Sequence, residues 1–369
     1  MKKKILVSLI LLFIVLTGLF ADFGYQFDLI SLEPLHKEYF ADRTRPDMSF
    51  HFLSYFEGAP DKILQDSYAS GAEQEVKVWN FKDDLTYNNL MFEIKVGETF
   101  GLFRNTFTFD SWLSPIAFDF SIQGELQSFY KGGFNDSYGY DGIYFYGGTI
   151  RVADVISLRV GYHHYCSHYG DAVFKNVTDV TPTVAGEEVA SGNWTKYKFI
   201  RMNDYVIGLS LEPTSWLRVY GEYNFPPQDI ITLRPIMFSP NWLKRRRNQL
   251  VDSDYSESYK ARIISAGIEL AFPIFKTLGN TTIGYDLHLY EEGKIIYDHE
   301  NGGPVTFDED APWEMEHNVK IAQNLSKTFS VELTYHNGRS PFNNFFFQHT
   351  EYVSFSFRVN PDNTVTLFK

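Results

Sequence analysis

The residues best suited to chemistry lie in one short stretch, 155–174, which reads VISLRVGYHHYCSHYGDAVF. It begins as an alternating strand and then crowds together three histidines, the single cysteine of the chain, a serine and an aspartate: His163, His164, Cys166, Ser167, His168 and Asp171. An imidazole can act as a general base near neutral pH, and a thiolate is a strong nucleophile. The stretch is therefore a candidate for nucleophilic catalysis, provided that a strand presents the right side chains together.

The spacing of His164 and Cys166 places both on one face of a strand, because successive side chains alternate between the two faces. With Asp171 at the base of the following loop, they form the predicted catalytic set for acyl transfer. Three other interpretations stay open. The stretch can be the polar end of a strand, its polar side chains can anchor the next loop by hydrogen bonds, or His164, Cys166 and His168 can bind zinc or copper, although this spacing matches no known zinc motif.

Strands elsewhere in the chain show what must position these residues. Apolar and polar residues alternate in the segments 116–126, 217–225, 261–272, 281–292, 328–336 and 351–359. Such segments, about nine to fifteen residues long with aromatics near their ends, suit tilted strands that cross a bilayer. The rival is a soluble sandwich, but aromatic residues make up 17% of the chain, which fits the aromatic girdles of a membrane barrel better than a soluble core.

The connections alternate between short turns and long loops, as they do in outer-membrane barrels. The short turns are expected at 111–114, 153–154, 213–215, 274–279 and 325–327, and the long loops at 131–139, 170–195, 226–258, 292–311 and 338–350. Further strands are expected at 48–57, 74–82, 89–98 and 101–111. The sequence thus predicts an all-β fold, a single transmembrane antiparallel β-barrel over residues 48–369, with about fourteen strands, or twelve as the alternative, and both termini in the periplasm.

The first residues predict export. Lys2, Lys3 and Lys4 precede an apolar run from Ile5 to Phe20, and Ala21 offers a cleavage point. Residues 1–21 therefore read as a secretory signal peptide rather than an uncleaved membrane helix, and residues 22–47 as a periplasmic segment. We expect the outer membrane of a diderm bacterium, with outer-membrane lipids and the barrel-assembly machinery as partners and no cofactor. A net charge of −13 argues against nucleic acid.

On this topology the strand at 156–169 runs outward and ends at the outer rim. Regular alternation points His164, Cys166 and His168 toward lipid, and Ser157, Arg159, His163, Tyr165 and Ser167 toward the lumen. Within the stretch, Ser167 and His168 are predicted to bind rather than to react.

A second cluster, 335–341, reads YHNGRSP and opens the last long loop. His336 has the inward phase, and His336, Arg339 and Ser340 are the predicted binding residues here. The cluster either anchors the loop, with Pro341 stiffening it, or uses the planar guanidinium of Arg339 to bind a phosphate or carboxylate.

The predicted lumen carries charges of both signs: Arg151, Arg159, Asp204, Arg218, Glu222, Glu269, Asp286, His288, Glu316, Lys320, Glu332 and Arg358. These charges can pair inside a plugged barrel or line a narrow channel, and the sequence does not decide between them. In the loop at 226–258, Lys244, Arg245, Arg246 and Arg247 are either solvated or dock on anionic lipid or polysaccharide. The leading function is a structural barrel or narrow solute channel, and the alternative is an outer-leaflet lipid hydrolase that uses His164 and Cys166.

Two resemblances support this interpretation. His164-Tyr165-Cys166 resembles the His-x-Ser pair that outer-membrane phospholipase A and the lipid A deacylases carry on a barrel strand, with Cys in place of Ser. The stretches 40–50 (FADRTRPDMSF), 164–174 (HYCSHYGDAVF) and 335–347 (YHNGRSPFNNFFF) together resemble a family of bacterial envelope proteins, domain-of-unknown-function family 1207. That resemblance implies an outer-membrane barrel and supplies no activity. Cys166 and Ala172 depart from the Ser and the acid of its pattern.

Overall fold

The computed structural model describes most of the chain, in segments. These are residues 23–59, 62–67, 75–80, 90–131, 137–170, 183–184, 187–188, 195–225, 232–238, 262–275, 278–291, 295–297, 305–307, 313–342, 345 and 348–359. Three predictions fall outside them: the signal peptide at residues 1–21, the proposed acid Asp171, and the basic run Lys244–Arg247.

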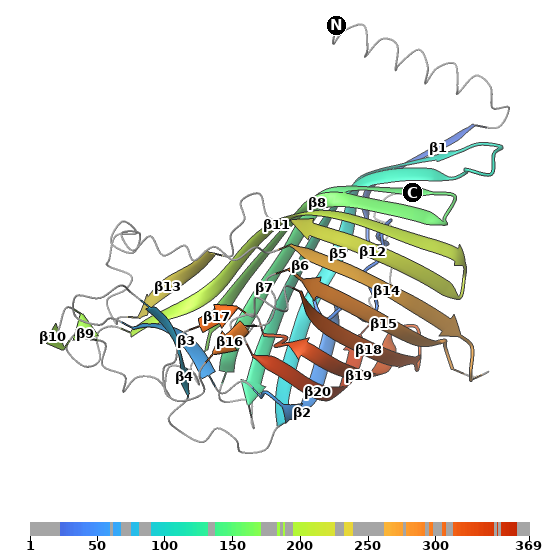
Figure 1. Ribbon diagram of the computed structural model, residues 1–369. Helices are drawn as coiled ribbons and strands as arrows, with labels where there is room; N and C mark the ends of the chain where they lie inside the picture. The colour runs from blue at the N-terminus through green and yellow to red at the C-terminus, as the bar shows by residue number, and fades with distance from the viewer. Residues whose placement is uncertain are drawn as a thin grey trace, which may run out of the picture.

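Twelve strands close into a single antiparallel barrel (Figure 1). In order around the barrel they are β2 (Met48–Glu57), β20 (His349–Val359), β19 (Phe329–Arg339), β18 (Glu314–Asn324), β15 (Thr281–Tyr290), β14 (Ile263–Phe272), β12 (Leu217–Phe225), β11 (Thr195–Thr214), β8 (Ile156–Tyr169), β7 (Ser137–Val152), β6 (Ile116–Lys131) and β5 (Leu90–Thr108). Pairing of β5 with both β6 and β2 completes the circle, so that the sheet has no open edge there. The predicted all-β barrel is confirmed.

The remaining strands lie beside this closed path. β1 (Gly24–Ser31) pairs with β5, and β13 (Thr232–Phe238) pairs with β11. Three short hairpins form at one end of the barrel: β3 (Lys62–Ser67) with β4 (Glu75–Asn80), β9 (Thr183–Val184) with β10 (Glu187–Glu188), and β16 (Ile295–Tyr297) with β17 (Val305–Phe307) (Figure 1).

The barrel has the lower of the two expected strand numbers, for two physical reasons. The strands expected at 89–98 and 101–111 are one strand, β5, in which a bulge between Leu102 and Asn105 shifts the register against β6. Phe103, inside the bulge, has a positive φ of 55°. Because a bulge adds one residue, the apolar phase changes there and imitates a strand boundary. The segment expected as a strand at 74–82 contains β4, which pairs in a hairpin and not in the barrel wall.

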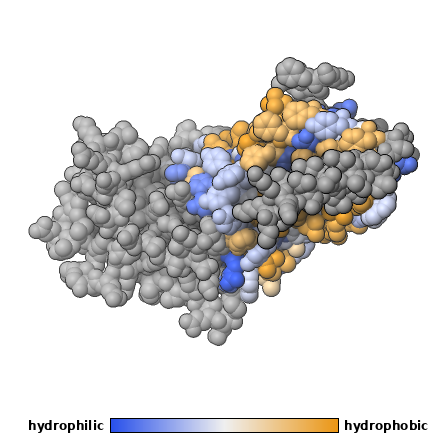
Figure 2. All heavy atoms as spheres, turned by 90° about the horizontal axis from the view of Figure 1, so that it is seen from above, coloured by the Kyte–Doolittle hydropathy of each residue, from blue (hydrophilic) through white to orange (hydrophobic). Residues whose placement is uncertain are grey.

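Alternation sorts the side chains of the wall as predicted. Apolar outward residues such as Val160, Ile207 and Leu333 are strongly exposed, whereas inward polar residues such as Ser210 and Glu316 are fully buried. Figure 2 shows the apolar residues gathered over the outer surface of the barrel. Among the described residues, no helix combines the length and the apolar character needed to cross a membrane.

The first strand of the wall is interrupted. β1 pairs with the Gly101–Thr108 part of β5, whereas β2 pairs with the Leu90–Val96 part. The chain leaves the wall after Ser31, fills the bore with residues 32–47, and rejoins the wall at Met48; we call residues 32–47 the luminal segment. The described part of the segment expected at 22–47 forms strand β1 and then the luminal segment, most of whose residues from Leu35 to Asp47 are buried.

Candidate functional site

The predicted catalytic residues His164 and Cys166 lie on the outward face of strand β8, and the lumen lies on its other face. Ser157, Arg159, His163, Tyr165 and Ser167 are buried, whereas the residues between them are partly or fully exposed. The pairing of β8 with β7 and with β11 proceeds without a register shift, so no bulge turns the side chains. His164, Cys166 and His168 therefore share the outward face, as the alternation predicts.

His164 has an orienting partner on the next strand. Asn203, directly opposite on β11, accepts a hydrogen bond through Oδ1 from Nδ1 of His164, with the two atoms 2.6 Å apart. With the proton on Nδ1, the lone pair lies on Nε2, which is the tautomer that a general base needs. Tyr144 stacks on the imidazole from the other side, with ring centroids 5.9 Å apart and planes inclined by 28°. The ring is thus held by both neighbouring strands.

Cys166 lies opposite a glycine of the neighbouring strand. Its Sγ is 3.7 Å from the carbonyl oxygen of Gly142, its register partner on β7. A Cβ at Gly142 would lie 3.0 Å from that sulfur and 3.3 Å from the Tyr144 hydroxyl, so glycine leaves room for the thiol and for the tyrosine. Tyr140, two residues before this glycine, stacks on His168 with centroids 4.8 Å apart. The thiol is thus surrounded by outward aromatic side chains of β7 and β8.

The other predicted residue of this stretch is on the opposite face. Ser167 is fully buried, and its hydroxyl donates to the carboxylate of Asp141 on β7. It therefore braces the inside of the wall and cannot share a site with Cys166.

The second predicted cluster also lies inside, on the far side of the barrel. Between β8 and β19 the order has five strands in either direction, β11, β12, β14, β15 and β18 on one side and β7, β6, β5, β2 and β20 on the other. His336 Nδ1 is 2.8 Å from Asn318 Oδ1, and its Nε2 is 2.8 Å from the carbonyl oxygen of Arg339. The Arg339 guanidinium bonds Glu314 and lies 4.0 Å from the Tyr290 ring centroid.

Because the side chains of His336 and Arg339 are buried and bonded within the wall, this placement fits the loop-anchoring interpretation. Ser340 is also fully buried. The sequence therefore predicted two sites, and the structure brings neither Ser167 nor this cluster to the outward pair.

The luminal segment is the feature that sequence analysis missed. Its acceptors and donors bond to strands around most of the barrel, at Lys95 and Arg104 of β5, Glu125 of β6, Arg151 of β7, Arg159 of β8, Glu222 of β12, Glu269 of β14, Glu316 of β18 and Glu332 of β19. The segment thus ties opposite walls together through the bore. Most of the predicted luminal charges are paired, and several of their partners belong to this segment.

Individual contacts show how closely the segment fits. The Tyr39 hydroxyl donates to Glu222 Oε2 at 3.0 Å, and the Tyr39 ring stacks on Tyr220, with centroids 4.0 Å apart and planes inclined by 9°. Arg43 Nε lies 2.9 Å from Glu316 Oε1, and Arg45 Nη2 lies 3.1 Å from Glu332 Oε1. All of these carboxylates are almost inaccessible to solvent, so the pairs hold in a medium of low dielectric.

The loop after β19 adds a second closure. Phe342 and Phe345 are fully buried, and Phe342 stacks on Phe129 of β6, with centroids 4.7 Å apart. Phe345 contacts Tyr138 of β7, with centroids 6.2 Å apart. Since β6 and β7 lie across the barrel from β19, this loop reaches over the end of the bore.

Within the described residues, no group of three or more His, Cys, Asp and Glu side chains is placed to hold a metal ion. Asn203, which sequence analysis missed, carried a usable signal: it has the outward phase of β11. Its register against His164 could not be counted, because the loop before β11 is long.

Comparisons with known proteins give structural neighbours that are outer-membrane barrels. The NanC porin aligns at 7% sequence identity and a TM-score of 0.38, over 85% of this chain and 99% of the porin. The outer membrane phospholipase A from Escherichia coli aligns at 9% identity and a TM-score of 0.38, over 86% of this chain and 94% of the phospholipase. A Pseudomonas aeruginosa FadL homologue aligns at 9% identity and a TM-score of 0.32, over 85% and 89%.

These values are too low to bear on activity. No known protein family matches the chain, so the resemblance to family 1207 is not confirmed. No curated protein matches it either.

Proposed function

We propose that this protein is an outer-membrane β-barrel with a closed bore, which serves the envelope as a structural element and does not conduct solutes in its resting state. The exposed apolar outer surface supports a bilayer location, since a closed barrel leaves no unpaired strand edge in lipid. The observation that carries the closed state is the luminal segment, which bonds to strands around most of the bore.

The strength of these bonds favours a permanent plug over a mobile gate. Arg43 and Arg45 each form an ion pair with a glutamate that is fully buried. Withdrawing the segment would leave Glu316 and Glu332 without these partners, and breaking one buried pair costs about 3–5 kcal/mol. Opening would require several such pairs to break together.

Single-channel recording in planar bilayers tests the proposal. The natural chain is expected to give no steady conductance. A variant in which a short Gly-Ser linker replaces residues 33–46 is expected to conduct, as is the double variant Arg43→Ala, Arg45→Ala if the deletion does not fold. Lys37→Met is the matched control, because Lys37 is exposed and its loss leaves the plug in place. Steady conductance by the natural chain would refute the closed bore.

A specific observation favours a second candidate function, lipid acyl hydrolysis at the outer surface. His164 is oriented by Asn203, and Cys166 lies on the same face of β8 beside Gly142. In the proposed reaction His164 Nε2 takes the thiol proton, and the sulfur forms a bond to an ester carbonyl carbon. The ester C–O bond breaks, the proton passes to the leaving alcohol, and water then cleaves the thioester to release the fatty acid.

Hydrolysis of phospholipid in mixed micelles tests this second candidate. Cys166→Ala is expected to abolish turnover, His164→Ala to lower kcat by about 100-fold or more, and Asn203→Ala to lower it less. The matched control is His317→Ala, since His317 also faces outward and hydrogen-bonds an outward tyrosine, Tyr285, at 2.8 Å. Turnover that survives Cys166→Ala and His164→Ala would remove this candidate.

A further inference from the structure

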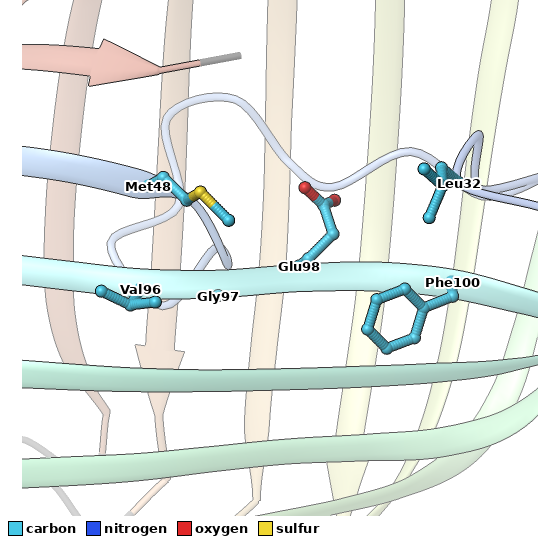
Figure 3. A pocket seen from close by; sticks show the side chains of 6 residues that line it. All are labelled: Leu32, Met48, Val96, Gly97, Glu98 and Phe100. Atoms are coloured by element: carbon cyan, nitrogen blue, oxygen red, sulfur yellow. The ribbon is translucent and has the colours of Figure 1, made fainter. Parts of the chain in front are cut away.

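The interruption of the first strand leaves a pocket in the outer surface of the barrel. It lies between the end of β1 and the start of β2, has a volume of about 350 Å³, and is lined by Leu32, Met48, Val96, Gly97, Glu98 and Phe100 (Figure 3). Val96 is 55% exposed and Met48 37% exposed, so the lining is continuous with the apolar surface of the barrel.

At this pocket the backbone N–H groups of β5 are hydrogen-bonded although neither β1 nor β2 pairs with this part of the strand. Gly97 N–H donates to the carbonyl oxygen of Asp47 at 2.9 Å. Two residues on, the N–H of Thr99 points to the same edge, and Oε1 of Glu98 accepts from it at 3.0 Å. One carboxylate oxygen of Glu98 therefore has a structural role. Its second oxygen, Oε2, receives no hydrogen bond from the residues that the structure describes.

Glu98 is an exception to the pattern of β5. It has the outward phase, which its neighbours Ile94, Val96, Phe100 and Leu102 fill with apolar side chains. Figure 3 shows its carboxylate rising from β5 between Met48 and Leu32. An ionisable side chain at a lipid-facing position is costly and is usually kept for a function.

A cation stands behind the same gap. Arg358, near the end of β20, is paired in register with Ser49, next to Met48. Its nearest carboxylate, Glu332, is 3.9 Å away, and its buried Nε has no hydrogen-bond partner within the described part of the chain. The pocket thus offers an apolar wall and one anion, and an incompletely hydrogen-bonded guanidinium lies on the strand that pairs with β2 at Met48 and Ser49.

We propose that this pocket binds one phospholipid with a zwitterionic amine-and-phosphate headgroup. Its acyl chain lies on Val96, Phe100 and Met48, its ammonium donates to Oε2 of Glu98, and its phosphate accepts from Arg358. Lipid access to the pocket rests on the proposed location in a bilayer. The site is separate from the thiol on β8, and it shares Arg358 with the ion-paired charges of the bore.

The test measures lipid retained by the purified full chain after reconstitution into nanodiscs of phosphatidylethanolamine mixed with phosphatidylglycerol, using native mass spectrometry. About one phosphatidylethanolamine per chain is expected, with at least tenfold preference over phosphatidylglycerol. Glu98→Gln and Arg358→Met are each expected to lower retention by about tenfold. Glu351→Gln is the matched control, because Glu351 is another carboxylate of the wall that bonds a neighbouring side chain, Tyr335.

Three results would overturn the proposal: no preference for phosphatidylethanolamine, equal retention by Glu98→Gln and the natural chain, or retention that arises only when residues 360–369 are deleted. The last result would mean that the C-terminal residues of the chain themselves fill the pocket. Co-elution of the chain with the nanodiscs on a sizing column reports bilayer insertion separately, so failure of the bilayer location is distinguishable from failure of the lipid site.

Discussion

Replacing Arg45 by methionine tests whether ion pairs hold the luminal segment in the bore. Arg45 Nη2 lies 3.1 Å from both Asp47 Oδ2 and Glu332 Oε1, and the three side chains are only 3%, 1% and 0% exposed. Methionine keeps most of the apolar stem of arginine and removes its charge. The substitution therefore isolates the loss of the pair from the loss of packing.

The size of the loss in unfolding free energy depends on how well the remaining residues compensate the charge of Glu332. Removing one partner of a buried ion pair costs about 3–5 kcal/mol, because the other charge stays buried without compensation. Glu332 retains Lys320 Nζ at 3.6 Å and Arg358 Nη1 at 3.9 Å, which compensate part of its charge. We therefore expect the free energy of unfolding to fall by about 3 kcal/mol, at the lower end of that range.

Urea titration of the chain in lipid vesicles, followed by tryptophan fluorescence, measures this change. The control is Lys37→Met: Lys37 pairs with Glu212 but is 55% exposed, so its loss should cost about 1 kcal/mol or less. The double variant Arg45→Met, Glu332→Met should cost less than the sum of the single changes, since the Arg45–Glu332 pair is then lost once and not counted twice, although Asp47 and Lys320 still lose a partner. A cost for Arg45→Met no larger than that for Lys37→Met would refute the role assigned to the pair.

Two further predictions concern the same plug. Phe342→Ala should lower the free energy of unfolding by about 3–5 kcal/mol in the same titration, because the ring is fully buried against Phe129; an exposed aromatic, Phe329, serves as control. Burial, with the positive charges of Arg159 and Arg218, holds the pKa of His36 well below its ordinary value of 6.5. Below about pH 6.5 the imidazole of His36 is protonated in the unfolded chain and stays neutral in the folded chain. The free energy of unfolding therefore decreases as the pH falls below about 6.5, and His36 causes no such decrease above that pH. His36→Gln should make the unfolding free energy less dependent on pH between about 6.5 and 5, and an unchanged slope would contradict the assignment.

The sequence predicted the wall because alternation is local. Whether His164 faces lipid depends only on its distance along one strand from residues such as Leu158 and Val160, and β8 contains no bulge that would break this count. Where a bulge does occur, at Leu102 and Asn105 of β5, the same rule failed and split one strand into two.

The luminal segment could not be predicted, because its apolar and polar residues do not alternate with the period of a strand or a helix. Residues 32–47 mix prolines, charges and aromatics in the manner of a solvated linker. Their fate is decided by partners far along the chain: Arg43 meets Glu316, and Phe40 N–H meets Glu269. The two residues of each pairing lie more than two hundred positions apart in the sequence. They meet only because of how the strands are arranged around the closed barrel, and the periodicity of single segments carries no information about that arrangement.

The two faces of the wall therefore do different work, and this bears on how the motifs should be interpreted. Arg45 of the stretch 40–50, Ser167 of the stretch 164–174 and His336 of the stretch 335–347 all have buried partners that close or brace the bore. The outward residues His164 and Cys166 take no part in that network. A substitution in the first set should therefore change stability and conductance together, whereas one in the second set should leave both unchanged. Any activity lost with Cys166 or His164 in a barrel of unaltered stability would then belong to the outer surface alone.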